Sequence, residues 1–262
     1  MEDSIADLID LLDSSNLKEI QSALNSLDVL LSQLLPEIVK FHKASSAPTP
    51  TNNNSSHPPG KLSTFIVLQD NFQYNIASHL INFYKYVLAN NTNVDEESLL
   101  TCNRLLQGLL LLHPNSRNIF NRTKNMKVIL DILEASDEIG FEATISVIST
   151  LIHILLKDFR NFRKFEENNG CSILIKSFKL SSFDMSRKSN SKDTKKTYNQ
   201  QDLNFKIIEF LIFYLIDETT IANATNDAST PLKSIKQKSD LFKSDFPDID
   251  SLIENLNELK EL

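Results

Sequence analysis

Apolar residues recur three or four positions apart along nearly the whole chain, which is the spacing of one face of an α-helix. Residues 5–12 mark a first short helix, and a leucine-rich stripe over residues 17–35 marks a long second one. Asn16 precedes the second stripe and Glu19 follows three positions later, the spacing of a capping box. Because no segment alternates for long with a period of two, the pattern predicts an all-α protein.

Further helices are predicted by the same spacing downstream of residue 61. They cover residues 62–89, 96–113, 114–121, 125–135, 137–157, 159–167, 171–180 and 201–218, and the tail 247–262. Between them lie two polar stretches that cannot bury a core. Residues 44–61 contain four prolines and no aliphatic side chain larger than alanine, and residues 181–199 are rich in lysine and serine. Both are predicted to be disordered insertions.

The chain is self-similar when it is shifted by 45 residues. Apolar positions between residues 106 and 133 then fall on apolar positions between residues 151 and 178, and residues 207–215 match residues 147–155 at a larger offset. Each unit consists of a long, a short and a medium helix, and a three-helix unit of roughly 40–47 residues is the armadillo/HEAT period. Such units close their hydrophobic faces by stacking, so we expect an armadillo/HEAT-like right-handed helical solenoid.

This pattern divides the chain into four parts. Residues 1–43 form an N-terminal helical cap, 44–61 a flexible linker, 62–218 the repeat core with the insertion 181–199, and 219–262 a C-terminal helical cap and tail. Both ends are acidic, and two roles for them remain open. They could give the array the polar outer faces that terminal repeats require, or they could dock a basic partner surface.

Composition and charge exclude several classes of protein. The net charge of −7 argues against chain-wide binding to nucleic acid or to anionic membranes. Four glycines without a Gly-rich phosphate motif exclude dinucleotide and P-loop folds, and two cysteines supply no disulfide framework. The acidic N-terminus lacks the pattern of a signal peptide, and no apolar run reaches the ~18–20 residues of a membrane span. We therefore expect a soluble cytoplasmic protein without membrane insertion.

The residue types that enzymes use for catalysis do not have the sequence spacing that known catalytic and metal sites require. No histidine has a second metal ligand three or four positions away; the five are His42, His57, His79, His113 and His153. A cysteine-based phosphatase needs an arginine six positions after its cysteine, but Gly108 follows Cys102 and Ser177 follows Cys171 at that distance. No nucleophile elbow or kinase signature occurs. The sequence predicts no enzyme, no metal, no cofactor and no small-molecule substrate.

One polar cluster, residues 113–126, is a candidate binding region. It places Arg117, Arg122 and Lys124 at or near the predicted turns between helices. Two interpretations remain open for these cations. They could satisfy the unpaired carbonyl groups at helix ends, or they could face a partner. The lysines of residues 187–196 are more typical of a solvated loop, open to phosphorylation, than of a phosphate or membrane site.

Four segments resemble a fungal family, the septation initiation network component called cell division control protein 14, which is unrelated to the phosphatase of that name. They are LQDNFQYNIAS at 68–78, LLHPNSRNIFNRTKNMKVILDIL at 111–133, RNFRKFEENNG at 160–170 and KIIEFLIFYL at 206–215. The resemblance spans residues 62–218, and the segment 111–133 is its most specific part.

The resemblance implies a non-catalytic subunit that binds a germinal-centre-type protein kinase and promotes septum formation and cytokinesis. It also implies a cytoplasmic protein that acts at the spindle pole body during mitosis. The family-typical positions suggest five partner-binding residues, His113, Ser116, Arg117, Arg122 and Asn125. Among the family-typical positions, Phe120 and Met126 are expected in the core, and Arg117, Arg122 and Asn125 are expected to be exposed.

Two other functions compete with this interpretation. The first is an armadillo-type adaptor that carries basic peptides or serves another scaffold. Nuclear import receptors of that kind line their groove with tryptophan and asparagine, and this chain has no tryptophan. The second is an enzyme with an unrecognised site, which turnover of generic phosphatase or nuclease substrates would reveal.

Overall fold

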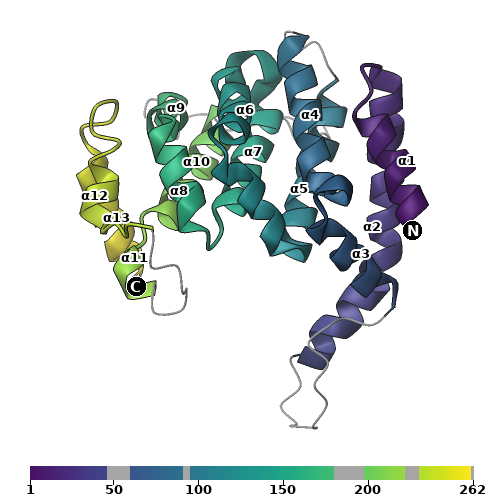
Figure 1. The fold of residues 1–262 in the computed structure, drawn as a ribbon. Coiled ribbons are helices and arrows are strands. Elements are labelled where there is room, and N and C mark those ends of the chain that lie inside the picture. The colour runs from purple at the N-terminus through teal and green to yellow at the C-terminus, as the bar shows by residue number, and fades with distance from the viewer. Residues whose placement is uncertain (46–59, 91–94, 180–197, 222–229, 261–262) are drawn as a thin grey trace, which may run out of the picture. The chain divides into compact units, whose positions relative to one another are not determined.

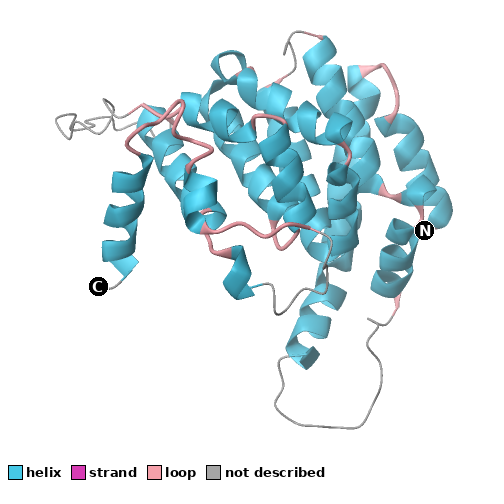
Figure 2. Ribbon diagram, turned by 60° about the vertical axis from the view of Figure 1, so that its left-hand side comes forward, coloured by secondary structure: helices cyan, strands magenta, loops and turns pink. Residues whose placement is uncertain are grey.

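The computed structural model describes residues 1–45, 60–90, 95–179, 198–221 and 230–260 (Figure 1). Within these ranges every regular element is a helix and no strand occurs (Figure 2). The all-α prediction is therefore confirmed for the part of the chain that is described. The chain divides into two compact units, residues 1–119 and 120–262.

The first unit is built on two pairs of helices. Its elements are α1 (Glu2–Leu12), α2 (Leu17–Ser45), α3 (Lys61–Asp70), the 3₁₀ helix η1 (Phe72–Tyr74), α4 (Ile76–Ala89) and α5 (Glu96–Leu112), followed by the start of the 3₁₀ helix η2 (Pro114–Asn121). The pairs are α1 with α2 and α4 with α5. Helix α1 packs on α2 and α4, and α5 packs on the same two helices. The core between them includes Phe65, Leu80 and Tyr84, and the Tyr84 hydroxyl donates to Asn103 Oδ1 at 2.7 Å.

The single helix predicted over residues 62–89 is wrong, because three side chains redirect the chain. The Asn71 side chain accepts the Gln73 N–H and starts η1, and the Asn75 side chain accepts the Ser78 N–H and starts α4. Gln69 Oε1 accepts the Ile76 N–H at 2.9 Å. Asparagine and glutamine that bond to the backbone in this way compete with a continuous helix. Phe72, which lies in the interrupted stretch, is 71% exposed.

The start of α2 confirms Asn16 as an N-cap, but the predicted capping box with Glu19 is not formed. Asn16 Oδ1 accepts the Lys18 N–H at 3.0 Å, as an N-cap should. The Asn16 N–H, however, donates to Ser14 Oγ, and Glu19 bonds to the side chains of Ser14 and Asn16. Helix α2 runs through Pro36 to Ser45 and α3 begins at Lys61, so both ends of the predicted linker 44–61 are helical. The remainder of that linker lies outside the described residues.

The second unit surrounds the apolar helix α7. Its elements are α6 (Thr123–Glu134), α7 (Ser136–Leu155), α8 (Phe159–Glu167), α9 (Gly170–Lys176), α10 (Gln200–Tyr214), α11 (Glu218–Ile221), α12 (Ile235–Ser239) and α13 (Ile249–Lys260). Helix α7 packs against α6, α8 and α10. Stacked and edge-on aromatic rings join α8 to α10, among them Phe162 and Phe165 with Tyr214 at centroid distances of 5.5 and 5.7 Å.

Helix α7 is long and apolar enough to cross a membrane by length and composition alone, and among the described residues one such helix is found. Two features indicate a helix of the protein core rather than a membrane span. Gly140 has φ 82° and ψ 171°, which interrupts the helix near its start. Val147, Leu151 and Ile154 are fully buried among the neighbouring helices of the unit.

Most predicted helices of the second unit are confirmed, with shifted ends. The prediction 159–167 matches α8, whereas the prediction 201–218 ends early, because α10 stops at Tyr214 and α11 begins at Glu218. Helix α12 has no predicted counterpart. Residues 198 and 199 of the predicted insertion are described, and Asn199 forms a capping box with Asp202 at the start of α10. The remainder of that insertion lies outside the described residues.

Candidate functional site

His113 ends α5 and belongs to a chain of polar contacts in the first unit. Its Nε2 lies 2.9 Å from Asp70 Oδ1 and its Nδ1 lies 2.8 Å from Ser116 Oγ. Asn75 Nδ2 donates to the same Ser116 oxygen at 2.8 Å and to the Gln69 carbonyl at 2.6 Å. The chain therefore links the end of α3, the start of α4 and the turn after α5.

The order Asp70–His113–Ser116 resembles the order of a serine hydrolase triad, but the surroundings differ. Ser116 is 2% exposed, and its oxygen accepts the Asn75 amide, so the hydroxyl has no open path to a substrate carbonyl. Hydrogen bonds from His113 and Asn115 hold the pKa of the Asp70 carboxyl below its usual value, which keeps it charged as an acceptor. The arrangement fixes a corner between helices.

Arg117 is buried, which corrects the expectation that it is exposed. Its Nη2 donates to the Leu110 carbonyl at 2.8 Å, near the end of α5, and the side chain is 8% exposed. A guanidinium at a helix C-terminus satisfies carbonyl groups that have no partner within the helix. For Arg117 the structural interpretation of the cluster is therefore confirmed.

The remaining candidates lie in the second unit. Asn125 is also buried, contrary to expectation, whereas Arg122 is exposed at the start of α6. Phe120 and Met126 are fully buried, as expected. The structure thus brings His113, Ser116 and Arg117 together at one buried corner, and it leaves Arg122 as the candidate on the surface. Partner binding by these residues stays a prediction.

A groove that sequence reasoning missed lies in the second unit, along α9. It consists of two adjoining hollows of about 580 and 370 Å³ that share Glu134, Ile173 and Lys176. Leu130 in one hollow and Leu133 and Leu203 in the other are buried beneath it. Its apolar surface comes from the half-buried Ile173 and the exposed Phe141. We call this surface the α9 groove.

The two walls of the α9 groove carry opposite charges. The wall from α6 and the start of α7 presents Asp131, Glu134 and Asp137. The opposite wall presents Lys176 and Lys179 and also Glu167, whose carboxylate pairs with Lys164 Nζ at 2.6 Å. Lys127 Nζ neutralises Asp131 at 2.8 Å within α6. Polar groups able to bond to a peptide backbone also line the groove; they are Asn168, Asn169, Ser172, Ser177 and Gln200.

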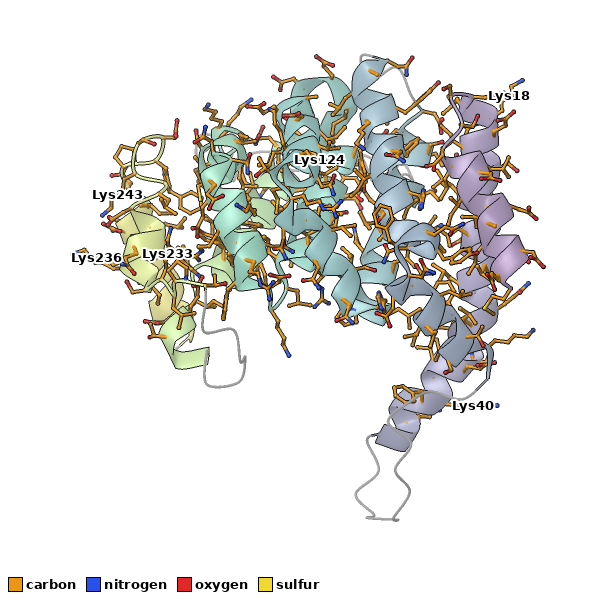
Figure 3. The ribbon with its side chains drawn as sticks, in the orientation of Figure 1. Lys18, Lys40, Lys124, Lys233, Lys236 and Lys243 are labelled. Atoms are coloured by element: carbon orange, nitrogen blue, oxygen red, sulfur yellow. The ribbon has the colours of Figure 1, made fainter. Side chains whose placement is uncertain are left out.

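One end of the α9 groove is formed by the C-terminal part of the chain. Ser244 lines the larger hollow. Hydrogen bonds from Ser172 and Ser244 lower the pKa of the Asp245 carboxyl, with a smaller contribution from the nearby charge of Lys176. Lys233, Lys236 and Lys243 are labelled on this same part of the chain in Figure 3. The charges of α6 and α9 were visible in the sequence, but nothing in it indicated that they face one another.

Comparisons with known proteins agree on one family. A family model described as "Cell division control protein 14, SIN component" matches residues 1–232. A protein of Schizosaccharomyces pombe named "Cell division control protein 14" is 26% identical over 163 residues, which is 59% of this chain and 60% of that protein. The match therefore spans less than two thirds of that relative's length. No solved structure matches.

The family match includes the buried corner, the α9 groove except Ser244, and all four segments on which the resemblance rests. It covers most of the chain. The chain therefore belongs to the family of cell division control protein 14, the component of the septation initiation network.

Proposed function

We propose that this protein is a non-catalytic scaffold or regulatory subunit of the septation initiation network that binds a germinal-centre-type protein kinase in the α9 groove. The proposed site of action is the cytoplasm and, during mitosis, the spindle pole body, where binding promotes septum formation and cytokinesis. Family membership supports the role in septation. The observation that carries the binding role is a groove that presents Ile173 and Phe141 between an acidic and a basic wall.

The groove fits a segment of protein with a matching distribution of side chains. Apolar side chains of the segment would cover Ile173 and Phe141, and basic and acidic side chains would face Glu134 and Lys176 respectively. Opposed charges fix the direction in which a segment lies, and they contribute more to specificity than to affinity. Holding the kinase on a subunit that is itself localised raises the kinase's effective concentration at that place.

An armadillo-like solenoid is part of the proposal. The order α5, η2, α6 is followed by the order α7, α8, α9, and each set has a long helix followed by two shorter elements. The middle elements of the two sets, η2 and α8, bond to the preceding helix in a similar way. Arg117 Nη2 donates to the Leu110 carbonyl and Asn161 Nδ2 to the Ile154 carbonyl, each seven residues earlier. Stacked repeats of this kind present extended binding surfaces.

The alternative adaptor for basic peptides fits the groove less well. A purely basic segment would meet Lys176 and Lys179 on one wall at close range, and like charges facing one another cost free energy. Walls of opposite charge favour a segment that carries both basic and acidic side chains.

Co-expression with the cognate germinal-centre-type kinase, followed by size-exclusion chromatography, tests the proposal. We expect a stable complex for the natural chain and a loss of affinity of tenfold or more for Glu134→Lys combined with Lys176→Glu. The matched control is Asp10→Lys with Lys40→Glu, because both residues are exposed in the first unit. Separation of two folded proteins would remove the kinase as the partner. Unchanged co-elution of the groove variant would remove the groove as its site.

A further inference from the structure

A buried cluster of charges joins α8 and α11 to the chain around α12. Glu218 and Lys238 have no exposed side-chain surface, and Lys238 Nζ lies 2.8 Å from Glu218 Oε1. Arg163 Nη2 reaches the same oxygen at 2.6 Å and Glu166 Oε1 at 3.1 Å. None of these residues lines the α9 groove, so the cluster needs an explanation of its own.

Lys238 occupies a complete binding site for an ammonium group. Its Nζ also donates to the carbonyls of Tyr214 at 2.9 Å and Ile216 at 3.1 Å, so each of its three protons has an acceptor. The same nitrogen stands over two aromatic rings, 4.7 Å from the centroid of Phe162 and 5.0 Å from that of Tyr214. Aromatic faces and a carboxylate together are a strong site for a desolvated cation. We call the Glu218 carboxylate, the two carbonyls and the two rings the ammonium cage.

A second lysine fastens the same part of the chain. Lys233 Nζ lies 2.6 Å from Glu166 Oε2, and that carboxylate also accepts the Tyr214 hydroxyl, through Oε1 at 2.6 Å. The backbone of Lys233 pairs with Glu218 in both directions: its N–H donates to Glu218 Oε2 at 2.9 Å, and its carbonyl accepts the Glu218 N–H at 3.2 Å. Lys233 and Lys238 thus hold the chain at two points.

This charged attachment is less favourable in free energy than an apolar contact would be. Burial lowers the pKa of Lys238 although Glu218 opposes the change, which reflects the cost of removing an ammonium group from water. An apolar contact of similar volume holds chain segments together at lower cost than a buried ion pair. What the charged arrangement adds is selectivity for a lysine side chain.

The cage and its occupant come from different parts of the chain. All the residues of the ammonium cage lie within the family match, residues 1–232, whereas Lys233 and Lys238 lie beyond it. The part of the chain shared with the family therefore builds the site, and the following part fills it.

We propose that the ammonium cage is a receptor for a lysine side chain, filled in this chain by its own Lys238. Together with the fully buried side chains of Phe242 and Ile249, this contact holds residues 231–250 as a strap on the second unit. The strap brings Ser244 and Asp245 to the end of the α9 groove, beside Ser172. A lysine-bearing segment of a partner that enters the cage displaces the strap and opens that end of the groove. This last consequence rests on the proposed function, whereas the cage itself does not.

Chemical rescue in the full-length chain tests the cage. Lys238→Ala removes the three-carbon chain and its ammonium group, and n-propylammonium replaces the lost atoms. We expect backbone amides of residues 235–246 to exchange hydrogen at least tenfold faster in this variant. Millimolar n-propylammonium should restore their protection, and n-propanol, which has the same carbon chain without the charge, should not.

Lys243→Ala is the matched control, because Lys243 is partly exposed and pairs with Asp240 and Asp250 on the same part of the chain. Its exchange over residues 235–246 should change less than twofold. If both solutes, or neither of them, restored the protection of residues 235–246 in Lys238→Ala, the proposal of the ammonium cage would be overturned.

Lys238→Met keeps most of the side-chain volume and covers the case in which Lys238→Ala fails to fold. We expect faster exchange confined to residues 231–250, with α7 and α10 still protected. Wild-type protection in this variant would show that the charge is not needed. Loss of protection throughout the second unit would show that residues 231–250 are core and no strap. A failure of kinase binding in the natural chain would leave these results unaffected, so the two proposals can fail separately.

Discussion

Gly170 and Gly108 both lie in helices, but the space around them differs. A Cβ atom on Gly170 would lie 2.2 Å from the ring of Phe165, which is fully buried, and 2.7 Å from the Phe165 carbonyl oxygen. A Cβ atom on Gly108 would meet nothing within 4 Å. We expect Gly170→Ala to lower the free energy of unfolding by about 3 kcal/mol, because neither the ring nor the backbone can move away cheaply.

Gly108→Ala is the control, and it should raise the free energy of unfolding by about 1 kcal/mol, since alanine favours an open helical position. Urea denaturation followed by circular dichroism measures both variants. Equal effects of the two substitutions would contradict the close packing of Gly170 against Phe165.

The two cysteines are predicted to be unreactive in the folded protein. Burial raises the pKa of the Cys102 and Cys171 thiols from 9.0 to about 12. Because the thiolate is the reactive form, iodoacetamide at pH 8 should modify the folded chain roughly 100-fold more slowly than the chain in urea. Mass spectrometry counts the labels, and rapid modification of either thiol without denaturant would show that it is accessible.

The same pKa values predict how stability changes in alkali. Between pH 9 and about 12 the unfolded thiols lose their protons while the folded ones keep theirs. The contribution of the thiols to the free energy of unfolding is therefore complete below pH 9 and is lost as the pH rises toward 12. Replacing both cysteines with alanine should flatten that part of the pH profile.

Single residues also show how far the candidate site could be predicted. The boundary between the helices predicted over residues 96–113 and 114–121 agrees with the end of α5 and the start of η2. The use of an arginine to satisfy helix-end carbonyls was one of two interpretations kept open for Arg117. The burial of Arg117 was not predicted, since burial depends on what packs over it. The partner of His113 is Asp70, which lies 43 positions earlier, and no spacing rule links them.

Among the elements, the break between α3 and α4 offers a test through two asparagines. Asn75 is buried, caps α4 through the Ser78 N–H, and bonds to Gln69 and Ser116. Asn71 is exposed and caps one turn of η1. Asn75→Ala should lower the free energy of unfolding by about 2–3 kcal/mol, because it removes a cap and leaves buried groups without partners.

Asn71→Ala should cost about 1 kcal/mol or less, and thermal unfolding of the two variants provides the comparison. A cost for Asn71→Ala as large as that for Asn75→Ala would mean that exposed capping alone sets the effect, and that the buried corner adds nothing.

The elements themselves were largely predictable where periodicity and capping agree. Residues 159–167 form α8 as predicted, with Asp158 as its N-cap. Residues 62–89 have continuous helical periodicity and are nevertheless three elements, because side-chain bonds from Gln69, Asn71 and Asn75 outweigh it. Helix α12 is five residues long, too short for a periodic signal, and its capping box of Ser234 and Gln237 was the available clue.

At the scale of the whole molecule, chelation should leave the protein unchanged. Within the described ranges no group of three or more histidine, cysteine, aspartate or glutamate side chains could hold a metal ion. A metal that binds the folded state alone would raise its stability, and removing it would lower the melting temperature. We expect EDTA to shift the melting temperature by less than about 1 °C, measured by circular dichroism. A larger fall would show a metal site that involves residues outside those ranges.

The α9 groove shows why the sequence could not supply the binding surface. Lys127 and Lys176 lie 49 positions apart and belong to separate predicted helices, yet they line the same hollow. Hydrophobic spacing predicts which face of each helix is buried, but it does not predict which helices meet. The all-α class follows from local pattern, whereas the groove depends on tertiary packing.

The charged cluster around Lys238 has a practical consequence for where this protein can be shortened. The family match ends at residue 232, which makes that position look like a natural boundary. A chain cut there would keep Glu218 and Glu166 inside the second unit, still in contact with Arg163 but without Lys233 and Lys238. Two carboxylates that share one guanidinium leave one buried negative charge uncompensated, and such a charge destabilises a fold by roughly 3–5 kcal/mol. Recombinant production of this protein should therefore extend at least to residue 250, eighteen residues past the boundary that sequence comparison suggests.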